Sequence, residues 1–299
     1  MGQRSSKVVR VRSSLVIGDD GRIDADVLYH MLEAGLEAMS GDGDRSAYLR
    51  SLFTRNDVIG MKVNTLGGPG MSTRVELVEV LSGMLDDSGL PQKNHIIWDR
   101  FDRELKAVGY TLKTRDGPRC FGTDHPGVGY ANHLVSKGKI GGLLSRILTE
   151  YCSATINVPV LKDHGVSGIT CSMKNHYGCI HNPNKYHDNG GDPYIADLNS
   201  LEQIRSSQRL IIVDCLKVQF HGGPAYHKSW AADYGGLLLA TDPVAVDTIG
   251  YGVIEGLRSK AGLEPLKGSR REPIYIKRAA EYGLGCDDPG AIDLKEIAV

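Results

Sequence analysis

Hydrophobic positions spaced three or four residues apart predict helices in three parts of the chain. In residues 24–39 these positions follow a potential capping aspartate and precede Gly41, a typical helix stop. A second helix is predicted after Thr73, because Glu76 three residues later completes the pattern of a capping box. A third is predicted after Asp242, which is followed by a proline.

Continuous apolar runs predict buried strands between these helices. A run of this kind is typical of a strand that helices cover on both faces. The alternation of strands and helices favours a largely parallel, doubly wound α/β sheet with helices on both faces. We expect a single domain over residues 1–299, with two interleaved lobes as the alternative. The predicted strands are residues 57–64, 95–99, 155–160 and 210–214.

The composition narrows the choice of partners. The chain has 35 Lys and Arg against 36 Asp and Glu, so no nucleic-acid or membrane-surface partner is expected. Its apolar runs are far shorter than the ~20 residues of a membrane helix, which predicts a soluble protein without a membrane span. Residues 1–7 have no apolar stretch behind their charges, so we expect no signal peptide here. Both a cytoplasmic and an exported protein whose signal was removed fit these features, and the sequence gives no oligomeric state.

Cysteine and glycine patterns exclude several cofactor motifs. The six cysteines form no Cys-x-x-Cys pair, which argues against a zinc ribbon or a ferredoxin-type cluster. Buried free thiols are expected, with disulfides as the alternative. The Gly-rich loop at residues 67–70 matches neither the dinucleotide-binding fingerprint nor the P-loop, so no nucleotide motif is present.

Polar side chains follow three of the predicted strands. They are Lys62 with Asn64, Lys162 with His164, and Asp214. Ligands of open α/β sheets bind outside the carboxyl ends of the strands, so these groups are expected to meet at one crevice.

The stretch from residue 162 to residue 187 carries most of the candidate chemistry. Its Gly, Ser and Thr residues allow backbone N–H groups to line an anion, and Lys162 and Lys174 supply positive charge. This predicts a phosphate or carboxylate ligand, and an ordinary surface loop is the alternative. His164, His176 and His187 are close enough in sequence to suggest a divalent transition metal, although their spacing fits no standard zinc pattern. Purely structural histidines are the alternative.

The ordered series of motifs resembles a widespread prokaryotic family, the domain of unknown function numbered 362. The resemblance runs from about residue 57 to residue 251, and it implies little about activity because the family is named for the lack of one. Members often carry an added iron–sulfur segment or a twin-arginine export signal, and this sequence shows neither. Asp163 stands where many relatives have a small hydroxyl residue, which would add negative charge beside His164 and favour a metal. The matching motifs are residues 61–64 (MKVN), 157–164 (NVPVLKDH), 173–178 (MKNHYG), Lys185 with His187, residues 213–214 (VD) and residues 242–247 (DPVAVD).

The resemblance also implies a set of recurrent polar positions, which largely coincide with the strand-end residues. Among the additions, Asp242 is expected to cap its helix, and Asp247 to bind a lysine or face solvent. The full set is Lys62, Asn64, Lys162, His164, Lys174, Asn175, His187, Asp214, Asp242 and Asp247.

These observations favour an enzyme that binds a small anionic metabolite. Lys62, Lys162 and Lys174 would hold the anion together with Asn64 and Asn175. The catalytic candidates are Lys174, His164, His187 and Asp214, and the metal candidates are His164, His176 and His187. The reaction would be proton transfer beside a carboxylate, as in a metal-dependent isomerase or lyase, or redox chemistry at a bound metal. The alternative is a non-catalytic accessory protein that carries a metal or redox centre.

Overall fold

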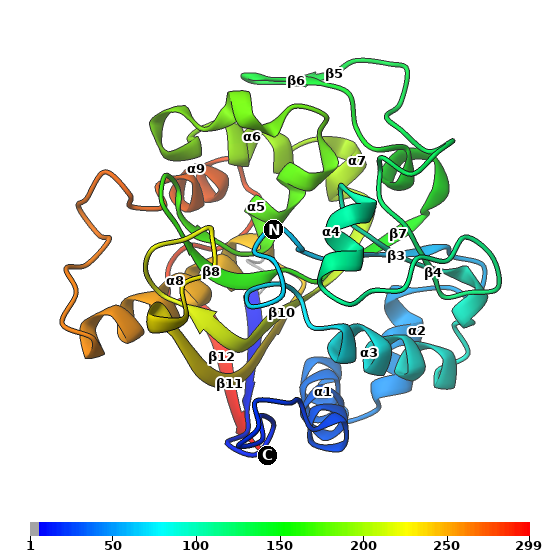
Figure 1. Cartoon of the computed structure of the whole chain (residues 1–299), viewed down its shortest axis with the longest axis horizontal. Helices are drawn as coiled ribbons and strands as arrows, with labels where there is room; N and C mark the ends of the chain where they lie inside the picture. Colours follow the sequence, from blue (N-terminus) through cyan, green and yellow to red (C-terminus); the bar gives the residue numbers. More distant parts are fainter. Residues whose placement is uncertain (1–5) are drawn as a thin grey trace.

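The computed structural model describes residues 6–299, and its centre is a ten-stranded, mostly parallel sheet (Figure 1). The expectation about the amino end rests partly on residues 1–5, which lie outside the described residues. A separate two-stranded hairpin consists of β5 (Val135–Lys137) and β6 (Ile140–Gly142). The strands of the large sheet are β1 (Ser6–Arg12), β2 (Ile59–Lys62), β3 (His95–Trp98), β4 (Arg119–Cys120), β7 (Ala154–Asn157), β8 (Val160–His164), β9 (Gly168–Thr170), β10 (Gln208–Gln219), β11 (Ala231–Ala240) and β12 (Ile292–Ala298).

The main path of this sheet runs β12-β1-β11-β10-β7-β2-β3-β4. Neighbours from β10 to β4 are parallel, β11 is antiparallel to both β10 and β1, and β1 is parallel to β12. Strand β11 is therefore the one strand of this described path that points the other way. The carboxyl ends of β2, β3 and β7 consequently meet at one edge of the sheet.

The helices contribute their apolar faces to two hydrophobic clusters that also include residues of the sheet (Figure 1). One cluster includes apolar residues of the first four helices, and the other includes residues of α5, α6, α8 and α9. Burial of these faces is the main favourable contribution to folding. The helices are α1 (Ala25–Ser40), α2 (Arg45–Leu52), α3 (Val75–Asp87), α4 (Asp102–Ala107), α5 (Ser172–Asn175), α6 (Tyr194–Asn199), α7 (Glu202–Arg205), α8 (Pro243–Lys260) and α9 (Tyr275–Glu281).

Two of the predicted helices begin and end as the sequence indicates. The Asp24 side chain accepts hydrogen bonds from the backbone N–H groups of Asp26 and Val27 at the start of α1, and Gly41 ends the helix with φ of 83°. Asp242 caps α8 in the same way. Local side-chain chemistry fixes both helices.

The capping box predicted at Thr73 is wrong. Helix α3 begins at Val75 after Arg74, and no side chain caps it. The Thr73 hydroxyl instead donates to the carbonyl oxygen of Val158 at 2.7 Å and accepts from the backbone N–H of Asn64 at 2.9 Å. It therefore fastens the loop after β2 to the end of β7.

The run at residues 155–160 forms the ends of two strands rather than one continuous strand. Strand β7 ends at Asn157, and β8 begins at Val160 after Pro159, which has no N–H for a sheet hydrogen bond. Both strands pair in parallel with the long strand β10. This step places Lys162 and His164 beyond the ends of β2 and β7.

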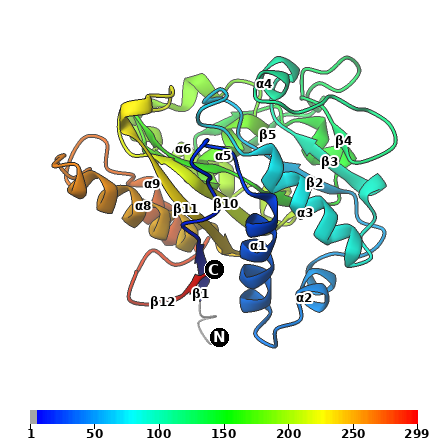
Figure 2. The same ribbon diagram turned by 60° about the horizontal axis from the view of Figure 1, so that its bottom comes forward.

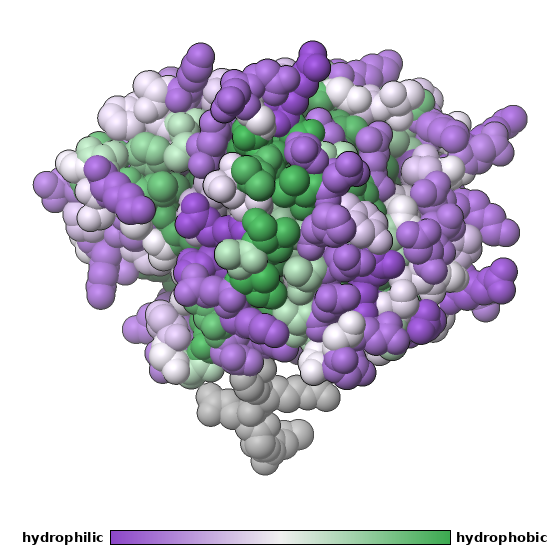
Figure 3. Space-filling view, turned by 90° about the horizontal axis from the view of Figure 1, so that it is seen from below, coloured by the Kyte–Doolittle hydropathy of each residue, from purple (hydrophilic) through white to green (hydrophobic). Residues whose placement is uncertain are grey.

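The first and last strands of the described chain lie side by side at the edge of the sheet (Figure 2). On the face seen from below, hydrophobic side chains gather in the middle and hydrophilic ones surround them (Figure 3). No helix within residues 6–299 is long and apolar enough to cross a membrane. All six cysteines are free thiols. Four of them are buried, so the expectation of buried free thiols is confirmed for these four.

Candidate functional site

A cavity of about 250 Å³ lies at the carboxyl edge of β2, β3 and β8. That volume equals roughly eight water molecules, which suits a small metabolite. Helices α4 and α5 and the turn at residues 183–187 complete its wall. Of the residues predicted from sequence, Lys62, Asn64, Lys162, His164, Lys174, Asn175 and His187 line this cavity.

Lys62 is neutralised by a carboxylate that the sequence did not single out. Its Nζ lies 2.7 Å from Asp99 Oδ1, 2.7 Å from the carbonyl oxygen of Val63 and 3.4 Å from Asn175 Oδ1. Both members of the ion pair are buried. An ammonium group has three N–H donors, so Lys62 has none left for a ligand.

Asn175 is the centre of a buried amide network. Its Nδ2 donates to the Lys62 carbonyl oxygen and to Asn157 Oδ1, and its Oδ1 accepts from Asn64 Nδ2 at 3.0 Å. With the contact from the Lys62 ammonium, both polar atoms of this amide are engaged. The network ties β2, β7 and α5 together, so Asn175 positions its neighbours.

Lys162 is fully buried and has no carboxylate partner among residues 6–299. Its Nζ donates to Asn64 Oδ1 at 3.0 Å and to the carbonyl oxygen of Met71 at 3.3 Å. Burial lowers the pKa of Lys162 to about 8, and the charge of Asp99 opposes that shift. One N–H of the ammonium group remains for a ligand in the cavity.

Lys174 has the fewest partners of the three lysines. Its Nζ lies 3.2 Å from His187 Nε2 and 4.1 Å from the centre of the Tyr177 ring. Burial and the positive charge of Lys162 lower the pKa of Lys174 to about 7. Near neutral pH a large fraction of this amine is therefore unprotonated.

The hydrogen bonds of His187 determine which ring nitrogen carries its proton. Nδ1 lies 3.1 Å from the carbonyl oxygen of Pro183, which can only accept, so Nδ1 is the protonated atom. Nε2 then presents a lone pair to Lys174. Burial, aided by the Lys174 charge, lowers the pKa of His187 below its usual value and favours this neutral form.

His164 has the opposite arrangement. Its Nδ1 accepts from the backbone N–H groups of Val166 and Ser167, both at 3.2 Å, so the proton is on Nε2. Burial, together with the Lys174 charge, lowers the pKa of His164 to about 2, which keeps the ring neutral. The ring stacks on His187, with 5.5 Å between centroids. His164 therefore supplies one N–H donor to this cavity.

Two predicted site residues lie elsewhere. Asp214 accepts from the backbone N–H groups of Arg74 and Leu216 and does not line the cavity, and burial raises its pKa to about 6. His176 is buried with Nδ1 at 2.7 Å from Asn199 Oδ1, and it too lies outside the lining. Asp214 lies within β10, which continues to Gln219, so the strand end predicted at this residue is wrong. His176 begins the helical turn after α5, and its ring contacts Asn199 of α6.

Two aspartates have partners that differ from the expectation. Asp247 is buried and accepts from the backbone N–H groups of Ser172 and Met173, the first residues of α5, so it neither binds a lysine nor faces solvent. Asp163 follows Lys162 on β8, and alternation along the strand turns it to the other side. There it forms an ion pair with Arg271 and accepts from the backbone N–H of Gly223, so its charge does not face the His164 ring.

Sequence reasoning missed Asp99 and Glu104. Asp99 is the last residue of the strand predicted at residues 95–99, and it directly follows β3 in the structure, so the strand-end rule that selected Lys62 could have found it. Glu104 lies on the short helix α4 and lines the cavity. Its pKa is raised by burial and by the charge of Asp99. Nothing in the spacing of the sequence marks that residue.

Few side-chain atoms that line the cavity are available to bind a metal ion. Within residues 6–299, no group of three or more His, Cys, Asp or Glu side chains is placed to hold a metal ion. His187 Nε2 has a lone pair directed at the cavity lysine, whereas the proton on His164 Nε2 would have to leave before that atom could ligate. The predicted metal therefore stays a prediction, with His187 as its best-placed ligand.

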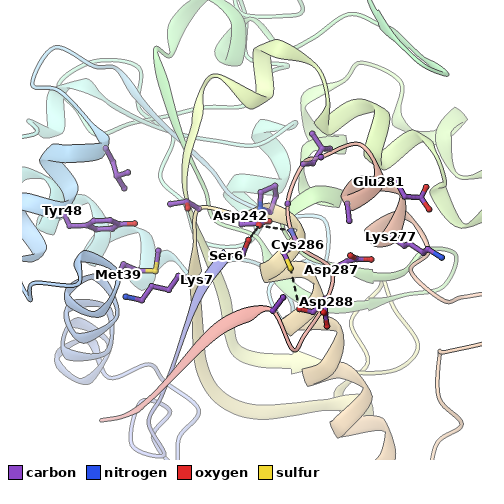
Figure 4. A pocket seen from close by; sticks show the side chains of 18 residues that line it. Ser6, Lys7, Met39, Tyr48, Asp242, Lys277, Glu281, Cys286, Asp287 and Asp288 are labelled. Carbon is purple, nitrogen blue, oxygen red and sulfur yellow. Dashed lines mark hydrogen bonds between the residues drawn. The ribbon is translucent and has the colours of Figure 1, made fainter. Parts of the chain in front are cut away.

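A second, wider cavity of about 1280 Å³ lies beside the start of α8 (Figure 4). Asp242 is at its centre, where it accepts from the Ser6 hydroxyl and the backbone N–H of Cys286 as well as capping α8. Its carboxylate is thus fully engaged, and we assign it a structural role, as the sequence predicts for a helix cap.

Comparisons with known proteins identify a family and no activity. The family model described as "Domain of unknown function (DUF362)" matches residues 61–252. No curated protein matches the chain. A crystal structure of a structural genomics target from Thermotoga maritima is similar with a TM-score of 0.34 and 12% sequence identity. That match covers 64% of this chain and 50% of the other, so the chain spans about half the length of that protein.

Proposed function

This chain belongs to the family of domain of unknown function 362, and from that premise we propose that it is an enzyme acting on a small carboxylate or phosphate metabolite in the 250 Å³ cavity. One observation carries the proposal. Lys162 and Lys174 line this cavity, both are buried, and neither has a carboxylate partner among residues 6–299. Buried cationic groups are costly unless they are paired, so an anion from solution is their natural complement.

The N–H groups without a protein acceptor among residues 6–299 limit the anion site to fewer residues than the sequence predicts. Lys62 and Asn175 are engaged by protein atoms and serve as supports. Lys162 has one spare N–H, and His164 presents its Nε2–H. Hydrogen bonds between charged partners are about twice as strong as neutral ones, so Lys162 would contribute most of the affinity.

The pair formed by Lys174 and His187 supplies the acid/base chemistry. A group with a pKa near the working pH both accepts and releases a proton readily, and Lys174 has a pKa of about 7. His187 Nε2, at 3.2 Å, can share that proton. We therefore propose that this pair transfers the proton next to the bound anion. Asp214, a catalytic candidate from the sequence, has no role in this proposal.

Calorimetric titration with phosphate, pyruvate and malonate tests the anion site. We expect at least one of them to bind at a single site per chain, and Lys162→Met to weaken that binding at least about tenfold. Lys260→Met is the matched control, because Lys260 is exposed on α8 and lies outside the cavity lining. Equal loss of affinity in both variants, or no binding to the unaltered protein, would contradict the proposal.

A metal-dependent form of this enzyme and a non-catalytic metal or redox carrier are the alternatives, and His187 Nε2 is the observation that favours them. Elemental analysis of untagged protein and of the His187→Ala variant distinguishes these two metal-based alternatives from the metal-free proposal. Stoichiometric metal that is lost in the variant would support a metal site. Protein without metal that still binds an anion would leave the lysine-based proposal.

For the fold we propose a doubly wound arrangement of the parallel strands β4, β3, β2 and β7. Its support is that α3 and α5 belong to hydrophobic clusters on opposite faces of these strands. A crystal structure with both helices on one face would contradict this arrangement.

A further inference from the structure

We propose that Lys174 is a carbonyl-capturing amine and that the ligand class is a small 2-oxo acid, whose carboxylate binds Lys162 and whose carbonyl carbon condenses with Lys174 Nζ. This inference rests on the proposed anion site and adds a covalent step and a substrate class to it. A plain anion site needs only positive charge, whereas several features around Lys174 favour a neutral, nucleophilic amine.

The first feature is the difference between the three lysines. Lys62 donates to three protein acceptors, and Lys162 donates to two oxygen atoms. Lys174 has a single hydrogen-bond partner among residues 6–299, the His187 ring nitrogen. No protein oxygen there holds its protons in place. Lysines that form imines are characteristically desolvated, and Lys174 is buried.

The second feature is a proton acceptor already in contact with the amine. His187 has its proton on Nδ1, where Pro183 fixes it, so Nε2 at 3.2 Å can take a proton from the Lys174 ammonium. The Tyr177 ring packs against the same amine, with 4.1 Å from Nζ to its centre. This packing fixes the end of a long side chain that would otherwise lose rotamer freedom on reaction.

The third feature is a neutral donor for the carbonyl oxygen. His164 is locked with Nε2–H free, and its ring stacks on His187, so that donor lies beside the amine. A neutral imidazole N–H stabilises the negative charge that develops on oxygen when an amine attacks a carbonyl. The two lysines thus match the two ends of a 2-oxo acid, and His164 matches its carbonyl oxygen.

The step balances without an oxidant or reductant. The lone pair of neutral Lys174 Nζ attacks the carbonyl carbon, and the C=O electron pair moves to oxygen. The nitrogen then releases its first N–H proton and the oxygen takes up one proton, which gives a carbinolamine. Loss of the second N–H proton and departure of the hydroxyl group as water form the C=N bond. One amine and one carbonyl compound therefore give one imine and one water. Protonation of the imine acidifies the neighbouring C–H, which is where the proposed proton transfer would act.

Reduction by sodium borohydride tests the imine directly. The full chain is incubated with pyruvate at pH 7.5, reduced, and analysed by intact mass and peptide mapping. We expect one pyruvate-derived adduct per chain, located on Lys174. Lys174→Met should lose it at least about tenfold, and Lys260→Met should retain it. Lactate, which has the same carboxylate but no carbonyl, should form no adduct and should compete with pyruvate.

The outcomes separate this inference from the proposed function. If lactate and pyruvate both bind but no adduct forms, the imine is wrong and the anion site stands. If neither pyruvate nor lactate binds and no adduct forms, this inference falls, and the proposed function falls with it only if phosphate and malonate also fail to bind. An adduct spread over exposed lysines, or one that persists in Lys174→Met, would also overturn the assignment. To check that the variant is folded, its circular dichroism and unfolding midpoint are compared with those of the unaltered chain.

Discussion

At the scale of single residues, the cavity contains three ammonium groups with different surroundings. Lys62 is paired with Asp99, and Lys162 is fixed by two neutral oxygen atoms. The Lys174 amine has one hydrogen-bond partner within residues 6–299, a histidine, and it packs on an aromatic ring. Sequence reasoning selected Lys62 and Lys162 because they lie at the ends of predicted strands, and Lys174 because it adds positive charge to the stretch from residue 162 to residue 187. It could not rank them, because the partners that decide their charge come from distant parts of the chain.

Lys174→Met should make the protein more stable at neutral pH. The pKa of Lys174 falls from 10.5 to about 7 in the folded state, so between these pH values the unfolded state binds more protons. Stability therefore falls as pH decreases from 10.5 to 7, and the variant avoids this loss. We expect a gain of about 2–4 kcal/mol at pH 7.5 that disappears near pH 10.5. Urea unfolding at both pH values measures it, and a variant less stable at pH 7.5 would contradict the burial of an unpaired amine.

At the scale of secondary structure, sequence patterns predicted helix starts correctly where the capping residue bonds only to neighbouring backbone groups. Asp24 and Asp242 cap their helices as predicted, since a cap uses only the backbone of the next few residues. Thr73 had the same local signal but is bound by Val158, which lies 85 residues further along the chain. A sequence pattern cannot show that a distant carbonyl oxygen competes for a hydroxyl group.

The attachment of α5 to α8 makes Asp247 a test at this scale. Its carboxylate accepts the first N–H groups of the short helix that carries Lys174. Asp247→Ala leaves two buried N–H groups without partners, which should cost about 2–4 kcal/mol of unfolding free energy and lower anion affinity. Asp242→Ala is the control, because Asp242 also accepts from backbone N–H groups at the start of a helix but lies outside the lining of the 250 Å³ cavity. The interpretation fails if both variants bind anions equally well, as measured by calorimetry.

At the scale of the whole molecule, much of the strand order in the sheet could not be predicted from the order of the strands along the chain. Strand β1 pairs only with β11 and β12 in the described sheet, so its neighbours are far away in sequence. The predicted strands are the parallel ones buried on both faces, which have continuous apolar runs. Shorter or half-exposed strands such as β9 and β12 lack that signal. The parallel core and its polar edge were thus predictable, and the sheet margins were not.

Buried titratable groups also give the whole molecule a pH dependence. Burial lowers the pKa of His95, His164 and His176 to about 4, 2 and 4, whereas it raises that of Asp214 and Asp247 to about 6 and 7. Near pH 5 the unfolded state gains three protons on the histidines, and the folded state retains two on the carboxyls. For these five groups the net difference is about one proton, which contributes a stability loss of roughly 1–2 kcal/mol per pH unit as pH falls from 5.5 to 4.5.

The variant His95→Gln isolates one of these groups, since His95 is buried at the start of β3 and lies outside the cavity lining. Urea midpoints at pH 5.5 and 4.5 should show a pH slope smaller by about one proton, or roughly 1.4 kcal/mol per pH unit. An unchanged slope would show that His95 does not stay neutral in the folded state.

The pairing of β1 has a further consequence for how the chain is made. Val8 has Ala240 and Leu294 as its sheet partners, so the first strand leaves the ribosome long before either exists. At about 5–20 residues per second, it waits on the order of ten to forty seconds for β11. During that time its valines would be exposed to solvent in an aggregation-prone segment. Lys7, Arg10 and Arg12 interrupt the segment, and such flanking charges protect unpaired strands from aggregation during synthesis.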